Sequence, residues 1–210
     1  KLRHPLDNIV YEKQKSPKKI HEYVTLDWEN IILAPLSNSS QQTQDELDYV
    51  FKAAMQRDEK NMVELVKQID TKTWSIFDEF LALHAPYSDR KKLEKMTEKT
   101  WDIVWKVVLN LKRKFNRPRP YQLRSDINVM TTKTHDTPAY PSGHASYGYS
   151  AAKVVSLVYP ELKDGVEKVA NTVAFARVLQ GVHYPSDCAA SKALMDKLWE
   201  DIGFKMFPEY

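Results

Sequence analysis

Cysteine is nearly absent from this sequence of 210 residues, since Cys188 is the only one. A single cysteine excludes an intramolecular disulfide framework and any cysteine-rich zinc or iron–sulfur site. Long apolar runs are absent too: the richest, 31–36 and 154–158, fall well short of the roughly 18 residues of a membrane span. We therefore expect a soluble protein without an integral membrane segment.

An excess of charge of one sign is also lacking. The sequence holds 31 lysines and arginines against 28 aspartates and glutamates, a formal net charge of +3. This balance does not indicate a dedicated nucleic-acid binder, so we expect no nucleic-acid partner. With 42% hydrophobic and 28% charged residues, the composition is that of a globular chain long enough to bury one substantial core.

A secretion signal is not recognisable, because the sequence starts at Lys1 without a charged-then-apolar segment. The compartment stays open, with a secreted or periplasmic location as one option if a leader has been removed. The oligomeric state is open as well, and a homodimer is one option.

The alternation of apolar and polar residues that is typical of β-strands is weak throughout the sequence. Apolar residues instead recur at helical spacing from residue 43 onward. Thr43 to Glu46 has the form of a capping box, and Ser186 is a candidate N-cap of the last helix. We predict an all-α, single-domain helical bundle over 43–210, with an active site formed by helix ends and loops on one face. Residues 1–42 are predicted to form an arm packed on it, with these anchors: Trp28, Ile31, Ile32 and Leu33.

Two of these helices carry a cation on the apolar stripe. Lys112 follows Val108 at i+4, and Arg177 follows Val173 at i+4. A buried cation is costly unless it meets an anion, so Lys112 either snorkels at the helix end or points into a site. Because solvation does not readily explain both cations, we expect a shared buried anion.

The segment 116–120 follows directly, and its prolines stop the helix and hold Arg119 on a stiff turn suited to clamping an oxyanion. We expect Arg117 and Arg124 to face solvent, the alternative being that they widen a positive funnel. The loop 121–140 is long enough to suggest a function. His135 and Tyr140 lie close in sequence to the next motif and are candidates to line the substrate pocket.

The next motif, Pro141-Ser142-Gly143-His144, opens a helix. Unpaired N–H groups and the positive end of the helix dipole suit an anion there, and His144 could do proton chemistry on it. Further on, Asp187 follows His183 by four residues, so its carboxylate can bond one imidazole nitrogen and leave the other free.

Taken together, the three segments resemble the type 2 phosphatidic acid phosphatase superfamily, which includes soluble bacterial class A acid phosphatases and vanadium-dependent haloperoxidases. The resemblance spans 112–187, and its strength lies in three spaced motifs in the right order. One position departs from the pattern: Ala176 stands where the family commonly has serine, which puts fine positioning in doubt.

The resemblance implies a role for each motif residue. His183 would attack phosphorus, Asp187 would fix its tautomer, and His144 would protonate the leaving alkoxide and then activate water. The phosphoryl group would be bound by Lys112, Arg119, Ser142, Gly143 and Arg177.

The implied activity is that of a metal-independent phosphatase acting on phosphomonoesters through a phosphohistidine. We expect no metal site and no cofactor, with vanadate binding as a phosphate mimic. Small phosphorylated compounds are the expected substrates, and lipid phosphates are an option. The alternatives are a vanadium-dependent haloperoxidase and a non-catalytic module that binds phosphate or phospholipid headgroups.

Overall fold

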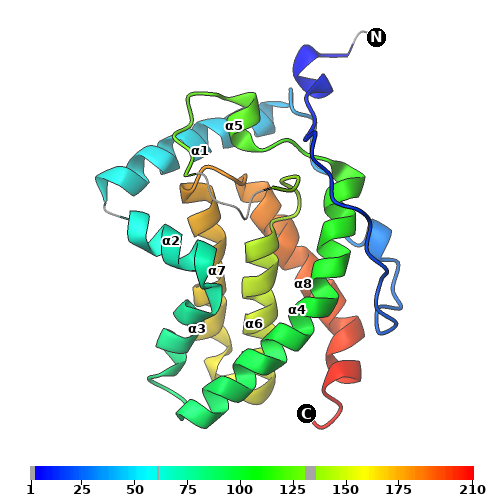
Figure 1. Cartoon of the computed structure of the whole chain (residues 1–210), viewed down its shortest axis with the longest axis vertical. Helices are drawn as coiled ribbons and strands as arrows, with labels where there is room; N and C mark the ends of the chain where they lie inside the picture. Colours follow the sequence, from blue (N-terminus) through cyan, green and yellow to red (C-terminus); the bar gives the residue numbers. More distant parts are fainter. Residues whose placement is uncertain (1–2, 61, 131–135) are drawn as a thin grey trace.

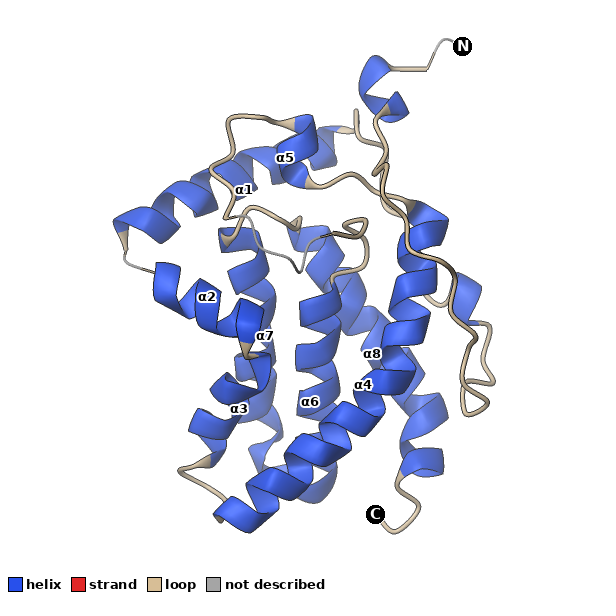
Figure 2. Ribbon diagram, viewed as in Figure 1, coloured by secondary structure: helices blue, strands red, loops and turns tan. Residues whose placement is uncertain are grey.

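The computed structural model describes residues 3–60, 62–130 and 136–210. These residues form helices and loops, with no β-strand among them (Figure 2). The predicted all-α fold class is therefore confirmed. The helices of these residues are α1 (Gln41–Glu59), α2 (Val63–Thr71), α3 (Thr73–Leu81), α4 (Tyr87–Phe115), α5 (Pro120–Leu123), α6 (Gly143–Val158), α7 (Lys163–Leu179) and α8 (Pro185–Met206), with 3₁₀ turns at Pro5–Asn8, Trp28–Asn30 and Pro160–Leu162.

Helix α6 forms the centre of the bundle and packs against α4, α7 and α8 (Figure 1). Small residues on α6 allow its neighbours to approach closely. A Cβ atom on Gly148 would lie 3.3 Å from Val173 of α7, which is tighter than ordinary contact. A larger side chain at Gly148 would therefore push α7 away from α6.

Helices α1, α2 and α3 cover α7 on the other side of the bundle. Helix α1 begins three residues earlier than the capping-box pattern predicts, because Ser40 is the N-cap and its hydroxyl accepts the Thr43 N–H. The proposed cap at Thr43 is wrong for this reason. Glu46, the other half of that pattern, is freed for contacts described below.

The N-terminal segment 3–40 runs along α4 and α8 (Figure 1). Asn110 of α4 donates to the Lys18 carbonyl and accepts the Lys18 N–H, and Asp201 of α8 accepts from Thr25. Of the four anchors expected in this arm, Ile31 and Ile32 are buried and Trp28 is partly buried, whereas Leu33 is 87% exposed, so that anchor is wrong. The division of the chain into arm and domain stays a prediction.

One end of the bundle gathers the termini of four helices. The C-terminal ends of α4 and α7 lie there with the N-terminal ends of α6 and α8 (Figure 1). Lys112 and Arg177 lie in the last turns of α4 and α7. His144 lies in the first turn of α6, and His183 directly precedes the start of α8. This arrangement brings three segments far apart in the sequence to one place.

The N-cap of α8 differs from the prediction. Tyr184 is the N-cap and Pro185 is the first helical residue, so Ser186 lies inside the first turn and not before it. Asp187 lies in that turn as expected, and its side chain accepts the Tyr184 N–H at 3.0 Å. The Asp187 carboxylate thus accepts a backbone N–H at the start of α8.

Candidate active site

A cavity of about 400 Å³ opens at this end of the bundle. Five of the eight predicted site residues line it: Lys112, Arg119, Gly143, His144 and His183. The other three, Ser142, Arg177 and Asp187, are buried: Arg177 contacts Asp70 and Asp187 contacts His183, both of which line the cavity, and Ser142 directly precedes Gly143 in the chain. The structure therefore brings the three sequence motifs together around one space.

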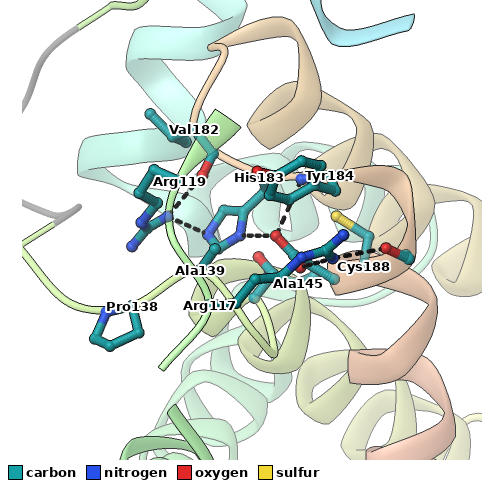
Figure 3. A network of polar contacts seen from close by, with 12 residues as sticks. Arg117, Arg119, Pro138, Ala139, Ala145, Val182, His183, Tyr184 and Cys188 are labelled. Atoms are coloured by element: carbon teal, nitrogen blue, oxygen red, sulfur yellow. Dashed lines mark hydrogen bonds and ion pairs between the residues drawn. The ribbon is translucent and has the colours of Figure 1, made fainter. Parts of the chain in front are cut away.

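His183 is held on both nitrogens of its ring. Its Nδ1 lies 3.0 Å from Asp187 Oδ2, and its Nε2 lies 2.7 Å from Arg119 Nη1. Figure 3 shows His183 between Arg119 on one side and the carboxylate contacted by Arg117 on the other. A guanidinium can only donate, so Nε2 must accept and the proton of the neutral ring is on Nδ1. The lone pair of Nε2 is therefore directed toward the guanidinium that would hold an oxyanion.

Burial lowers the pKa of His183 below its ordinary value, and the cations Arg119 and Lys112 lower it further. The ring is only 2% exposed. An imidazole in these surroundings stays neutral at pH values where a free histidine is protonated. A neutral ring with its lone pair on Nε2 is the form that can act as a nucleophile.

Lys112 and Arg119 bring two positive charges to the cavity wall. Lys112 Nζ donates to the Pro138 carbonyl at 2.5 Å and to the Ala139 carbonyl at 3.3 Å. Arg119 donates to the carbonyls of Thr137 and Val182, both at 2.9 Å. Lys112 thus points into the site and does not snorkel.

Among the described residues, no carboxylate lies within ion-pair distance of Lys112 or Arg119. Burial, followed by the nearby Arg119, lowers the pKa of Lys112 well below its usual range. Burial and the nearby Arg177 lower the pKa of Arg119 to about 10. Both shifts report cations that lack an anionic partner, which a bound dianion would supply.

Arg177 differs, because the protein supplies its anion. Its Nη1 forms a buried ion pair with Asp70 Oδ1 at the end of α2. The shared buried anion therefore stays a prediction for Arg177, which already has an anionic partner in Asp70. Asp70 is 4% exposed and also lines the cavity, and the sequence reasoning missed it.

His144 lies one residue inside α6 and faces the same carboxylate. Its Nε2 is 3.1 Å from the Asp70 carbonyl oxygen and 3.9 Å from Asp70 Oδ1. Because a carbonyl only accepts, Nε2 carries a proton in this arrangement. Burial and the Arg177 charge lower the pKa of His144 to about 3, although Asp70 opposes the shift. The imidazolium form therefore requires a further negative charge in the cavity.

The start of α6 supplies the donors expected of an anion site. Ser142 is the N-cap, and its hydroxyl accepts the Ala145 N–H at 3.4 Å. Gly143 follows as the first helical residue and lines the cavity, where its N–H has no acceptor within the helix. The phosphate-binding roles of Ser142 and Gly143 stay predictions.

Arg117 is the clearest error of the sequence reasoning, which placed it in solvent. It is 3% exposed, its Nη1 donates to Asp187 Oδ1 at 2.7 Å, and its guanidinium lies 3.7 Å above the Tyr184 ring. Glu46 of α1 contacts Arg117 at 3.3 Å and accepts from the Ser186 N–H and hydroxyl at 2.6 and 2.7 Å. A chain of contacts thus runs from Glu46 through Arg117 and Asp187 to His183.

The remaining candidates lie elsewhere. Arg124 pairs with Asp48 and Asp126 near the surface, as expected of a residue outside the site. Tyr140 does not line the cavity, because its hydroxyl donates to the Leu33 carbonyl at 2.6 Å. His135 lies outside the described residues. Ala176 is buried on α7, and its effect on positioning stays a prediction.

No group of three or more histidine, cysteine, aspartate or glutamate side chains gathers at metal-binding spacing in the described part of the chain. No helix among the described residues is both long and apolar enough to cross a membrane.

Comparison with known proteins adds evidence independent of this geometry. The family model of the PAP2 superfamily, the type 2 phosphatidic acid phosphatases, matches residues 103–195. This segment contains all three motifs and all eight predicted site residues. The chain therefore resembles the PAP2 superfamily over residues 103–195. Asp70 and Glu46 lie before the PAP2 segment, which explains why its motifs did not point to them.

One protein similar in sequence to this chain is the non-specific acid phosphatase of Providencia stuartii. It is 31% identical over 106 residues, which is 49% of this chain and 41% of the relative. The chain thus aligns with less than half the length of that relative.

Two solved structures share the PAP2 fold with this chain. A bacterial vanadium-dependent iodoperoxidase has a TM-score of 0.61 at 16% identity, covering 86% of this chain and 54% of its own. A transmembrane PAP2 phosphatidylglycerolphosphate phosphatase from Bacillus subtilis has a TM-score of 0.52 at 18% identity, covering 82% and 89%. At these identities the likeness shows the fold alone.

Proposed function

We propose that this chain is a phosphatase that hydrolyses phosphomonoesters through a phosphohistidine on His183, without a metal ion. The observation that carries the proposal is the pair of buried cations, Lys112 and Arg119. Neither pairs with a carboxylate of the described residues, and both line the cavity with His183, whose Nε2 lies 2.7 Å from Arg119. A phosphoryl group would supply the missing negative charge and present phosphorus to the Nε2 lone pair. The acid phosphatase relative supports the same activity.

In the first step, His183 Nε2 attacks phosphorus. The Arg119 N–H that now bonds Nε2 at 2.7 Å would turn to a phosphoryl oxygen, which releases the lone pair. The N–P bond forms as the P–O ester bond breaks, and the electron pair of that bond goes to the leaving oxygen. Asp187 accepts the Nδ1–H and stabilises the positive charge that develops on the ring.

His144 would supply the proton for the leaving oxygen. In the free protein its pKa of about 3 keeps it neutral, so the proton must arrive with a monoanionic ester or be taken up once the phosphoryl charge is in place. In the second step, neutral His144 takes a proton from water as the water oxygen attacks phosphorus. The P–N bond then breaks, and phosphate and neutral His183 are regenerated.

Vanadate is the natural probe of this site, because it is a tetrahedral oxyanion like phosphate. We propose that it binds between Lys112, Arg119 and His183 and inhibits turnover. The structural likeness to an iodoperoxidase makes halide oxidation a second candidate for the vanadate-loaded protein. Iodide oxidation with vanadate and peroxide, measured beside phosphatase activity, separates the two functions.

The test of the main proposal is phosphate release from 4-nitrophenyl phosphate, with and without EDTA. We expect turnover that EDTA leaves intact, that vanadate inhibits and that His183→Ala abolishes. Unchanged turnover in His183→Ala, or strict dependence on a divalent metal, would contradict the proposal. Tight phosphate binding with no phosphate release would instead indicate a binding module.

A further inference from the structure

The cavity has a second wall that the phosphoryl chemistry does not use. Three large aromatic side chains, Trp101 and Trp105 of α4 and Tyr147 of α6, line it beside the cationic residues. The Trp101 ring centroid lies 5.5 Å from those of both Trp105 and Tyr147, tilted by 36° and 80°. The three rings therefore form one continuous surface, called here the aromatic wall.

Core packing alone does not account for the aromatic wall. Trp101, Trp105 and Tyr147 pack against the core, but each is only partly buried and all three border the cavity. Other aromatic residues of this bundle, such as Phe77, are buried completely. A ring that keeps an accessible face toward a cavity offers that face to a ligand.

The aromatic wall stands where a leaving group would emerge. Tyr147 follows His144 by three residues, so both side chains lie on the same side of α6, one turn apart. Trp105 approaches the start of that helix, since a Cβ on Gly143 would lie 3.4 Å from its six-membered ring. His144 is the proposed proton donor to the leaving oxygen, so whatever that oxygen carries meets Trp105 and Tyr147 first.

The other borders of the cavity limit what this group can be. Thr71, at the end of α2, and Thr73, at the start of α3, also line the cavity. Lys15 and Asp136, two further lining residues, form an ion pair of 3.1 Å. Among the described residues, such polar borders and a cavity volume of about 400 Å³ suit a phosphate with one compact ring system.

We propose that the aromatic wall is a leaving-group subsite, and that the preferred substrates are phosphomonoesters whose alcohol carries a flat aromatic ring. Aryl-bearing alcohols and nucleosides share this chemistry. The rings would stack on or pack edge to face against Trp101, Trp105 and Tyr147. This inference rests on the proposed phosphatase function and adds the substrate class to it.

Two substrate pairs test the wall without changing the ester bond. Adenosine 5′-monophosphate and ribose 5-phosphate share a primary ester and differ by the base. Benzyl phosphate and cyclohexylmethyl phosphate match in size and differ in ring flatness. Because an aromatic ring packs more favourably than an aliphatic one against the faces and edges of other rings, we expect kcat/KM to favour the aromatic member by roughly tenfold in both pairs.

Variants on two different helices locate the effect. Trp101→Leu and Tyr147→Leu should each bring both kcat/KM ratios toward one. Trp199→Leu is the matched control, because Trp199 is also a partly buried tryptophan, packed 6.3 Å from Phe207 and outside the cavity lining. Using α4 and α6 separately keeps the test valid if one variant fails to fold.

Equal kcat/KM values within both pairs, or ratios unchanged in both wall variants, would overturn the inference. Faster turnover of short-chain phosphatidic acid than of benzyl phosphate would overturn it too, in favour of an aliphatic leaving group. If no ester is hydrolysed, the proposed function fails. Calorimetric binding of adenosine 5′-monophosphate and ribose 5-phosphate to the wild-type protein still tests the wall, and equal affinities would refute it.

Discussion

The two histidines of the cavity are held in opposite ways. His183 is 2% exposed, and its nitrogens contact the side chains of Asp187 and Arg119. The His144 side chain is 19% exposed and has one hydrogen bond in the described structure, to the backbone carbonyl of Asp70. Every contact of His183 constrains its ring, whereas His144 keeps room to turn toward a bound group.

This difference matches the two chemical tasks. A nucleophile must be neutral, fixed in one tautomer and aimed at phosphorus, and the contacts of His183 provide each of these conditions. An acid that later acts as a base must change protonation state within one cycle. The ion pair of Asp70 with Arg177 lies beside His144. Its two charges shift the pKa of His144 in opposite directions, while the Asp70 carboxylate stays 3.9 Å from the ring nitrogen.

The largest effect on turnover should come from replacing His183, the more constrained histidine. We expect His183→Ala to lower kcat by about 10⁴-fold or more, because no other group can form the covalent intermediate. Protein quenched in alkaline detergent during turnover of a labelled phosphomonoester should carry a base-stable, acid-labile phosphate in the wild type and none in His183→Ala.

The control for this prediction is His84→Ala. His84 lies exposed beyond the end of α3, with its ring 4.8 Å from Phe80. It should retain wild-type turnover and labelling. A labelled His183→Ala protein would show that the nucleophile is a different residue.

Replacing the less constrained histidine should have a smaller effect that depends on the substrate. We expect His144→Ala to lower kcat by about 10²–10⁴-fold for benzyl phosphate, whose alkoxide needs a proton to leave. The loss should shrink for 4-nitrophenyl phosphate, whose phenolate leaves without one. Measuring both substrates in the same variant checks this role, and an equal loss on both would contradict it.

Regular features of the site could be predicted from the sequence. Helix periodicity placed Lys112 and Arg177 on buried stripes, and the three motifs placed His144 near His183. These inferences depend on spacing within one helix or one turn, which the sequence displays directly.

The partners of those residues could not be predicted. Asp70 and Glu46 lie 107 residues from Arg177 and 71 residues from Arg117, on helices whose placement is set by packing across the whole bundle. Arg117 was placed in solvent because an arginine is usually exposed unless paired, and its partners belong to α1 and α8. Long-range ion pairing of this kind leaves no periodic signal.

A moderate effect on turnover is expected from replacing Arg117, which pairs with the Asp187 carboxylate that holds His183. Arg117→Met should lower kcat by about 10- to 100-fold and destabilise the fold by about 3–5 kcal/mol, since it leaves the buried Asp187 carboxylate without its 2.7 Å ion pair. Without that cation, Asp187 would stabilise the His183 imidazolium more strongly. The acid limb of the kcat/KM profile should therefore move to higher pH.

Glu46→Gln and Arg117→Lys complete this test. Glu46→Gln removes a charge from the far end of the chain of contacts and should shift the same limb less. Arg117→Lys keeps the positive charge and should restore the profile in part. If stability changes while the pH profile stays that of the wild type, Arg117 acts on folding only.

The wild-type pH profile should be asymmetric for the same electrostatic reason. Since burial and nearby cations depress the pKa of both histidines, the protein keeps its reactive protonation state well below pH 6. The ester should then set the alkaline limb, because its second ionisation, near pH 6, removes the proton that His144 requires. We expect kcat/KM to fall about tenfold per pH unit above that value. Aryl phosphates with different second pKa values should move this limb in parallel, and an unmoved limb would assign it to the protein.

The smallest expected effect is the contribution of His144 to the pH dependence of the free energy of unfolding. With a pKa of about 3 in the folded protein and about 6.5 when unfolded, His144 binds fewer protons in the folded state between these values. The free energy of unfolding should therefore decrease as the pH falls from about 6.5, by at most about 1.4 kcal/mol per pH unit from this group. His144→Gln should flatten that dependence in urea titrations across this range, while His84→Gln should not. Inorganic phosphate should flatten the wild-type dependence as well, because the bound anion favours the protonated ring that the empty cavity disfavours.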